Sequence, residues 1–209
     1  MSQFDLFSAG QSKYSSLDEL LHEMKRMKED PLAKAGTNVV ISRGNPKARL
    51  LIIGEAPGPE ENVKGKPFVG RAGQMLDKIL QAANFDPEKD VFITNSVFRM
   101  PPGEDGKAFR KPTTEEIEYY RPCVLEIIRL IDPLIMLLTG NVACQSILGK
   151  TGITSLRGKW VQVQERWAMP IFHPSYLLRN PVREPGSPKA LMWDDIKKVR
   201  KKYDELAGK

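Results

Sequence analysis

The sequence contains very little cysteine and histidine, with two residues of each among 209. Cys123 and Cys144 both lie among apolar residues, and neither has another Cys or His at metal-ligand spacing. We therefore interpret them as buried, inert thiols of a reducing compartment; a site that uses either thiol is the alternative. The two cysteines accordingly predict no metal site.

Long apolar runs are also missing. No stretch approaches the roughly 20 residues that a membrane span needs, and the polar, acidic start lacks the charged region and apolar run of a signal peptide. We therefore expect a soluble, cytoplasmic protein without a membrane partner. We also expect a monomer. The 32 Lys and Arg residues against 26 Asp and Glu give a net charge of +6, which is compatible with a polyanionic partner but does not require one.

Hydrophobic patterning predicts alternating strands and helices. Apolar runs typical of buried strands occupy residues 49–54, 91–94, 134–139 and 169–172, with a candidate extension at 160–163. Helical stripes occupy residues 17–29, 72–83, 113–131, 141–148 and 189–206. The alternation predicts an α/β fold, a three-layer α/β/α sandwich around a central, mainly parallel four-stranded sheet. Residues 1–15 are polar and Ser-rich, so we expect a flexible N-terminal arm before a single domain of residues 16–209.

Three loops follow predicted strands, at residues 54–73, 94–112 and 173–183. Ligands of parallel sheets bind beyond the carboxyl ends of the strands, so these loops are the candidate site. Gly70 and Gly73 would let a phosphate or a base edge approach the next helix, although glycine-rich turns often have no such role. The amide of Asn95 could bind a ligand or cap a turn, and for His173 a structural role competes with a chemical one.

The loops contain four motifs, which are Gly54-Glu-Ala-Pro-Gly58, Pro67-Phe-Val-Gly-Arg-Ala-Gly73, Thr94-Asn95 and His173-Pro-Ser-Tyr-Leu-Leu-Arg179. In this order they resemble the motifs of the uracil-DNA glycosylase superfamily, most closely those of its family-four enzymes. The resemblance covers residues 17–200 and implies a uracil-DNA glycosylase-like fold. It also implies a monofunctional enzyme of base excision repair, which flips uracil out of DNA and hydrolyses its N-glycosidic bond to leave an abasic site.

The resemblance further implies roles for single residues. Glu55 would orient or deprotonate the attacking water and stabilise the cationic sugar, and a neutral His173 would donate a hydrogen bond to the developing oxyanion on uracil O2. Phe68 would stack on the base, and Asn95 would bond its pairing edge. The implied uracil pocket consists of Gly54, Ala56, Phe68 and Asn95. The implied DNA contacts, with residues 176–178 as an apolar wedge, are Gly70, Arg71, Arg110, Ser175, Tyr176, Leu177, Leu178 and Arg179.

Family-four enzymes usually hold an iron–sulfur cluster on four cysteines, and this sequence departs from them there. The four positions align with Met27, Asp30, Arg99 and Tyr120. None of these side chains is a thiolate, so we expect no cluster, no metal and no other cofactor. In place of the cluster, we predict that Asp30 pairs with Arg99 and that Met27 packs against Tyr120.

A second departure concerns the loop at residues 103–112. A related branch of the superfamily carries a histidine here that bonds covalently to the deoxyribose. That histidine is absent and Arg110 lies closest to its position, so we expect turnover. The alternatives are a non-turnover binder or covalent trap of uracil-containing DNA, and a glycosylase that prefers another deaminated base.

The N-terminal arm carries one more motif. Gln3-Phe-Asp-Leu-Phe7 resembles the pentapeptide by which bacterial replication and repair proteins dock on the sliding clamp. We therefore predict the sliding clamp as a second partner, besides uracil-containing DNA. The implied contacts are Gln3, Asp5, Leu6 and Phe7, with the last two in an apolar pocket. The alternative is that the apolar residues of the arm fold back on the domain.

Overall fold

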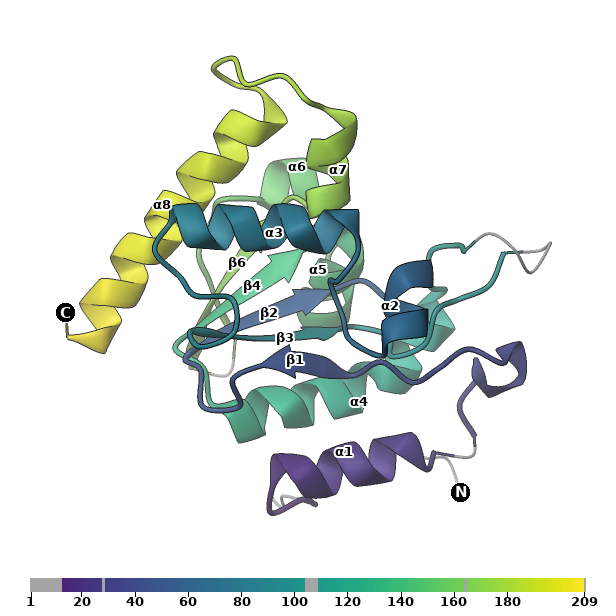
Figure 1. Ribbon diagram of the computed structural model, residues 1–209. Helices are drawn as coiled ribbons and strands as arrows, with labels where there is room; N and C mark the ends of the chain where they lie inside the picture. The colour runs from purple at the N-terminus through teal and green to yellow at the C-terminus, as the bar shows by residue number, and fades with distance from the viewer. Residues whose placement is uncertain (1–12, 28, 104–108, 164, 209) are drawn as a thin grey trace.

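The computed structural model describes residues 13–27, 29–103, 109–163 and 165–208 (Figure 1). Its centre is a sheet with strand order β1-β3-β2-β4-β6-β5. The strands are β1 (Ser42–Gly44), β2 (Leu50–Gly54), β3 (Val91–Asn95), β4 (Ile135–Thr139), β5 (Val161–Val163) and β6 (Arg166–Ile171). β3, β2, β4 and β6 run parallel, which confirms the predicted four-stranded centre. β1 and β5 add antiparallel edges, of which only β5 has a counterpart among the predicted segments.

The central strands are buried on both faces. In β2, Leu51 and Ile53 belong to one hydrophobic cluster, whereas Leu50 and Ile52 belong to another. Successive side chains of a strand point to opposite faces of the sheet, so the two clusters are the two sides of the sandwich. A strand covered on both faces can be apolar throughout, which is why continuous apolar runs mark these strands in the sequence.

Helices form the outer layers of the sandwich (Figure 1). One face of the sheet carries α1 (Leu17–Lys25), α4 (Thr114–Ile131) and α5 (Gly140–Leu148). The other face carries α3 (Arg71–Ala82), α7 (Pro174–Arg179) and α8 (Pro188–Ala207). Side-chain oxygens of Ser16 and Thr113 cap α1 and α4 by accepting backbone N–H groups. α1 ends at Lys25, earlier than the predicted end at residue 29.

Several short helices lie in segments that the sequence pattern leaves as loops. They are the 3₁₀ turn η2 (Ala33–Ala35), α2 (Pro59–Lys64), α6 (Ile153–Leu156) and α7. None exceeds six residues, which is too short for a helical stripe to appear in the sequence. α2 and α7 follow β2 and β6 directly, so they shape the carboxyl edge of the sheet.

The N-terminal pentapeptide and most of the predicted arm lie outside the described residues. Tyr14, close to the end of the predicted arm, is buried in the cluster beneath α1 and α4. Its carbonyl oxygen accepts a hydrogen bond from Arg129 Nη2 at 2.6 Å, so the chain is anchored to α4 by residue 14. In the ranges that the structure describes, no helix is both long and apolar enough to cross a membrane.

Candidate active site

The four motif-bearing segments meet at the carboxyl edge of the sheet. Gly54 and Asn95 are register partners at the ends of β2 and β3. A Cβ added at Gly54 would collide with Asn95 Oδ1 and with the Phe68 ring, so both side chains crowd this glycine. The Phe68 and His173 rings lie 5.8 Å apart between centroids at an interplanar angle of 31°. The structure therefore places Gly54, Phe68, Asn95 and His173 close together at this edge of the sheet.

The Phe68 backbone adopts an unusual conformation that orients its ring. Its φ is +54°, in the left-handed region that residues other than glycine rarely adopt. Gly73 permits this turn, because a Cβ there would overlap the Phe68 carbonyl. Arg43 of β1 holds the turn from the other side, donating from Nε to Pro67 O at 3.0 Å and from Nη2 to Phe68 O at 3.3 Å.

Arg43 is a residue that the sequence pattern did not single out. Its side chain is only 7% exposed, and its guanidinium is paired with Asp77 Oδ1 at 2.5 Å and with Glu88 Oε1 at 2.9 Å. A buried cation with these partners is fixed in position. The edge strand β1 therefore reaches across to the Phe68 turn, so Arg43 supports the floor of the predicted uracil pocket.

Glu61 organises the rest of the same loop. Its carboxylate accepts the backbone N–H groups of Val69 at 2.9 Å, Gly70 at 2.8 Å and Gly58 at 3.1 Å. The N–H of Gly70 already donates to Glu61, so it is not available to a phosphate at the start of α3. The side chain of the next residue, Arg71, is exposed and could contact such a phosphate.

Glu55 follows β2 and is half-buried. Burial raises the pKa of its carboxyl group, and the positive charges of Lys111 and Arg179 oppose that rise. Among the described residues, nothing forms a hydrogen bond with this carboxylate. Lys111 was not among the predicted site residues, whereas its neighbour Arg110 was. The Arg110 guanidinium is instead held within the domain, donating to both carboxylate oxygens of Glu116 at 2.6 and 2.9 Å.

His173 is the N-cap of α7, and this fixes its tautomer. Its Nδ1 accepts the backbone N–H of Ser175 at 3.2 Å and lies 2.8 Å from Ser175 Oγ. Because Nδ1 is an acceptor, the proton of the neutral ring is on Nε2. Burial, assisted by the charge of Arg179, lowers the pKa of His173 to about 4. The ring is therefore neutral near pH 7, with Nε2–H as its free donor.

The predicted wedge residues differ in exposure along α7. Tyr176 is 39% exposed and Leu178 is half-buried, so both are accessible from outside. Leu177 is only 1% exposed and packs in the cluster shared with α3 and α8. Its place on the inner side of the helix keeps it from acting with Tyr176 and Leu178 as part of an outward-facing wedge. Arg179 is exposed at the end of α7.

Three of the four positions that align with the cluster cysteines, Asp30, Arg99 and Tyr120, form a polar network. Arg99 Nε donates to Asp30 Oδ2 at 2.6 Å, which confirms the predicted pair. Tyr120 O–H donates to Asp30 Oδ1, and Arg99 Nη1 donates to Thr37 O. Met27 packs against the hydrophobic cluster that contains Tyr120.

An iron–sulfur cluster does not fit these residues. They supply no thiolate, and the Asp30 carboxylate already accepts hydrogen bonds from Arg99, Tyr120 and the backbone N–H of Leu32. Over the described ranges, no group of three or more His, Cys, Asp and Glu residues could hold a metal ion. Burial raises the pKa of Cys123 to about 11 and that of Cys144 to about 12, so both thiols are protonated near neutral pH.

The chain is similar to known proteins over most of its length. Residues 41–197, which include all three strand-end loops, match the family model described as the uracil DNA glycosylase superfamily. A protein named type-4 uracil-DNA glycosylase from Archaeoglobus fulgidus is 34% identical over 204 residues, or 93% of this chain and 94% of that protein. Proteins of the same name from Thermotoga maritima and Sulfurisphaera tokodaii are 36% and 33% identical, covering 88% of this chain in each case and 93% and 84% of their own lengths.

Proposed function

The chain belongs to the uracil-DNA glycosylase superfamily and excises uracil from DNA as a monofunctional repair enzyme, and on this premise we propose that Glu55 and His173 perform the cleavage. The observation that carries this assignment is the hydrogen bond from Ser175 N–H to His173 Nδ1. It leaves Nε2–H as a neutral donor next to Phe68, where the base would stack.

Uracil enters the pocket after the nucleotide has been flipped out of the DNA stack. Its ring stacks on Phe68, and the Asn95 amide bonds the pairing edge, accepting from N3–H and donating to O4. Asn95 is only 2% exposed, so these bonds form away from competing water. Gly54 and Ala56 line the pocket, and a side chain at position 54 would occupy the space of Asn95 and Phe68.

Cleavage breaks the bond between C1′ of the sugar and N1 of uracil. The electron pair leaves with the base, so negative charge develops on uracil O2 and positive charge on the sugar. His173 Nε2–H donates to O2, and a neutral donor stabilises this charge without transferring its proton. The pKa of about 4 means that the ring enters the reaction in its neutral form near pH 7.

Glu55 acts on the other side of the sugar. Its carboxylate orients a water molecule toward C1′ and stabilises the cationic sugar; the water oxygen bonds to C1′ and its proton passes to Glu55. Lys111 and Arg179 favour the ionised carboxylate against the effect of burial. The half-buried carboxylate makes no hydrogen bond to the described residues and is therefore available to water.

DNA is held around this pocket by exposed groups at the same edge of the sheet. Arg71 and Arg179 contact phosphates, and Tyr176 and Leu178 fill the space that the flipped nucleotide leaves. Ser175 contributes by orienting His173, in addition to any contact with DNA. Arg110 acts through its pair with Glu116, which positions the segment that carries Lys111.

The N-terminal pentapeptide docks on a bacterial sliding clamp, which would bring a monomeric, cytoplasmic enzyme to newly made DNA. Support comes from its sequence, Gln3-Phe-Asp-Leu-Phe7, and from its position seven residues before the anchored Tyr14. That spacing allows a reach of roughly 23 Å from the domain at about 3.3 Å per extended residue.

The decisive experiment is excision itself. The protein is incubated with a uracil-containing oligonucleotide and EDTA, and alkali is used to reveal abasic sites. Alkali-labile sites at the uracil position are expected from the wild type and not from Glu55→Gln. Tight binding without such sites would indicate a non-turnover binder, and a band shift that survives denaturation would indicate a covalent trap. Preferential cleavage of a hypoxanthine-containing strand would indicate a different deaminated base.

A further inference from the structure

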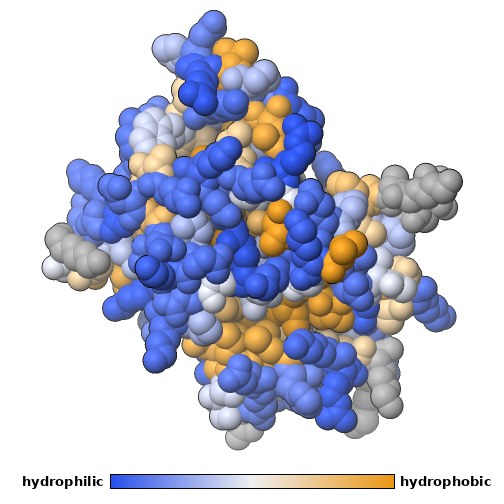
Figure 2. Space-filling view, viewed as in Figure 1, coloured by the Kyte–Doolittle hydropathy of each residue, from blue (hydrophilic) through white to orange (hydrophobic). Residues whose placement is uncertain are grey.

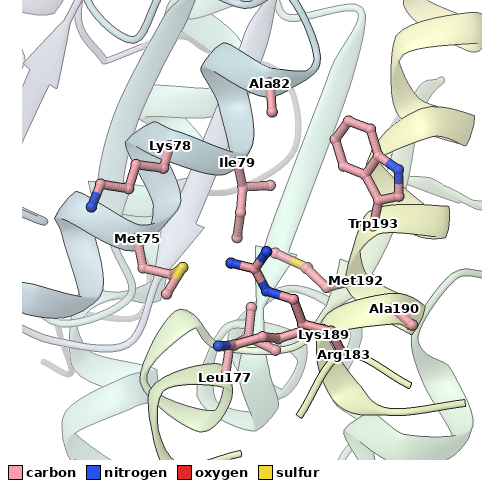
Figure 3. Close-up of a pocket in the computed structure, with 10 residues that line it drawn as sticks. All are labelled: Met75, Lys78, Ile79, Ala82, Leu177, Arg183, Lys189, Ala190, Met192 and Trp193. Atoms are coloured by element: carbon pink, nitrogen blue, oxygen red, sulfur yellow. The ribbon is translucent and has the colours of Figure 1, made fainter. Parts of the chain in front are cut away.

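A second pocket, distinct from the predicted uracil pocket, lies between α3, α7 and α8 (Figure 3). Its volume is about 570 Å³. The walls are mainly apolar, with Met75 and Ile79 on α3 and Met192 and Trp193 on α8. Figure 3 shows Trp193 standing on α8 across from Ile79 and Ala82 of α3. Nothing in the mechanism above uses this space.

We propose that this pocket binds an unpaired nucleotide of the DNA strand that flanks the uracil. The base would insert between Trp193 and the α3 side chains, and its phosphates would lie against Lys78 and Arg183. The inference rests on the proposed function, because it takes the strand to be the one held at α7.

The lining of the pocket has the composition of a site for single-stranded DNA. Such sites combine an apolar or aromatic platform for the base with cations for the backbone. Trp193 is 38% exposed here, although tryptophan is usually more deeply buried. Val182 is 51% exposed on the adjoining loop. In the view of Figure 2, hydrophobic surface near the start of α8 is bordered by hydrophilic residues.

The charge of the pocket is of one sign. Among the described residues, its lining includes Lys78, Arg183 and Lys189 and no acidic residue. Lys189 donates from Nζ to Pro181 O at 3.1 Å, which ties the loop before α8 to the helix. Within the described residues, neither Lys78 nor Arg183 has an ion-pair or hydrogen-bond partner. Figure 3 shows the Arg183 side chain between α3 and α8, with its guanidinium toward Met75 and Ile79.

The pocket is continuous with the proposed DNA-binding edge. Leu177 forms part of its wall, while its neighbours Tyr176 and Leu178 lie toward the outside of the same helix. α7 has six residues, so a strand that crosses it reaches the pocket after about 9 Å. A base inside a duplex could not enter the pocket, because its pairing partner would have to separate. The occupant is therefore an unpaired nucleotide.

The test compares single-stranded substrates that differ only in their flanks. One uracil-containing strand has long flanks on both sides, and two others are truncated next to the uracil on the 5′ or the 3′ side. Lys78→Ala, Arg183→Ala and Trp193→Ala are compared with Lys198→Ala, which removes an exposed lysine of α8 outside the pocket.

Each pocket variant is expected to raise KM for the long strand about 5- to 10-fold, with kcat unchanged. The effect should disappear for one of the two truncated strands and be absent in Lys198→Ala. The slope of log affinity against log salt should fall by roughly 0.7 for each cation removed. Strand binding should quench Trp193 fluorescence in the wild type, and this quenching should be lost in Trp193→Phe.

Equal effects on the long and both truncated strands, or no effect on any of them, would refute the pocket as a DNA site. Binding of an acidic peptide in the pocket, without competition from single-stranded DNA, would also refute the pocket as a DNA site. If the wild type releases no uracil from any strand, the proposed function fails separately. In that case the pocket is judged from the anisotropy of a labelled, uracil-free strand, whose binding must still weaken in Lys78→Ala and Arg183→Ala.

Discussion

The carboxyl edge of the sheet and the network of Asp30, Arg99 and Tyr120 use polar side chains in opposite ways. In the network, both Asp30 oxygens accept hydrogen bonds from the described residues and Arg99 also bonds Thr37 O. At the carboxyl edge, Glu55 and His173 Nε2 keep their hydrogen-bonding capacity free within the described part of the chain. A buried polar group without a partner costs free energy of folding, whereas a satisfied network does not incur that cost.

We expect this difference to separate the residues needed for activity from those needed for stability. Groups at the carboxyl edge can complete their hydrogen bonds only when substrate or water arrives. Groups in the network complete theirs when the chain folds. Substitutions at the edge should therefore reduce the rate with little loss of stability, and substitutions in the network should do the reverse.

Glu55→Gln should give the largest effect. The change removes the proton acceptor and the negative charge while keeping the size of the side chain, so the single-turnover rate should fall about 10²- to 10⁴-fold. Binding of uracil-containing DNA and the thermal unfolding midpoint should stay close to wild type. Unchanged activity would exclude Glu55 as the catalytic carboxylate.

Asp30→Asn should have its main effect on stability. It leaves Arg99 buried without its anionic partner, and breaking such a pair costs about 3–5 kcal/mol of the free energy of unfolding. Denaturant unfolding measures this loss, and the folded fraction should retain its kcat. Tyr120→Phe is the matched control, because it removes only the neutral donor and should cost about 1–3 kcal/mol. Iron analysis of the wild type should find no stoichiometric metal; a cluster-level iron content would overturn the interpretation of this region.

His173→Ala should lower the single-turnover rate about 10²- to 10³-fold through loss of an oxyanion donor. Between pH 7 and pH 5, titration of His173 should not lower the rate, because its pKa is about 4. Any decline in this range should come from protonation of Glu55, whose pKa is raised by burial, and should appear equally in His173→Ala. Stability has a different dependence: the folded ring resists protonation more than the unfolded one, so stability is lost as pH falls from about 6.5 toward 4. A rate that declines through pH 6.5 in the wild type, but not in the variant, would contradict the neutral-donor role.

Arg43→Gln tests whether the edge strand positions Phe68. Loss of the bonds to Pro67 O and Phe68 O should loosen the stacking surface and weaken inhibition by free uracil about 10-fold. Binding of abasic DNA should be unaffected. Glu88→Gln is the control, because it removes a partner of Arg43 that does not touch the Phe68 turn. Equal losses of uracil and abasic-DNA binding in Arg43→Gln would show that the residue has only a general structural role.

The arm should give the smallest effect on catalysis. Leu6→Ala combined with Phe7→Ala should leave cleavage of free oligonucleotides unchanged while abolishing binding to a bacterial sliding clamp. A peptide of residues 1–9 should bind the clamp with micromolar affinity, about −8 kcal/mol. A loss of thermal stability in the double variant would indicate that the two residues pack on the domain instead.

Sequence patterns reveal the strands of this fold in which every successive side chain is buried. The apolar runs of β2, β3 and β4 are visible because both faces of those strands are covered. β1 reads Ser-Arg-Gly and carries no such signal; its strand state depends on pairing with β3. α2 and α7 are too short to show a helical stripe.

The residues of the candidate site also fall into those that the sequence reveals and those that it does not. Glu55, Asn95 and His173 stand out because they lie just past the ends of predicted strands. Arg43 and Glu61 do not, because a charged residue bonded to a distant backbone group looks like a solvated one in the sequence. Lys111 could have been suggested by its position next to Arg110, but only the fold shows which of the two acts on Glu55.

The network of Asp30, Arg99 and Tyr120 also bears on how this protein is produced. Side chains close this part of the domain, so we expect the polypeptide to mature by folding alone, without delivery of iron and sulfide. During iron starvation, the amount of folded protein would then depend on how much is translated and not on the iron supply. Peroxide, which dismantles iron–sulfur centres, would find no such target in these residues, so uracil repair could continue during oxidative stress.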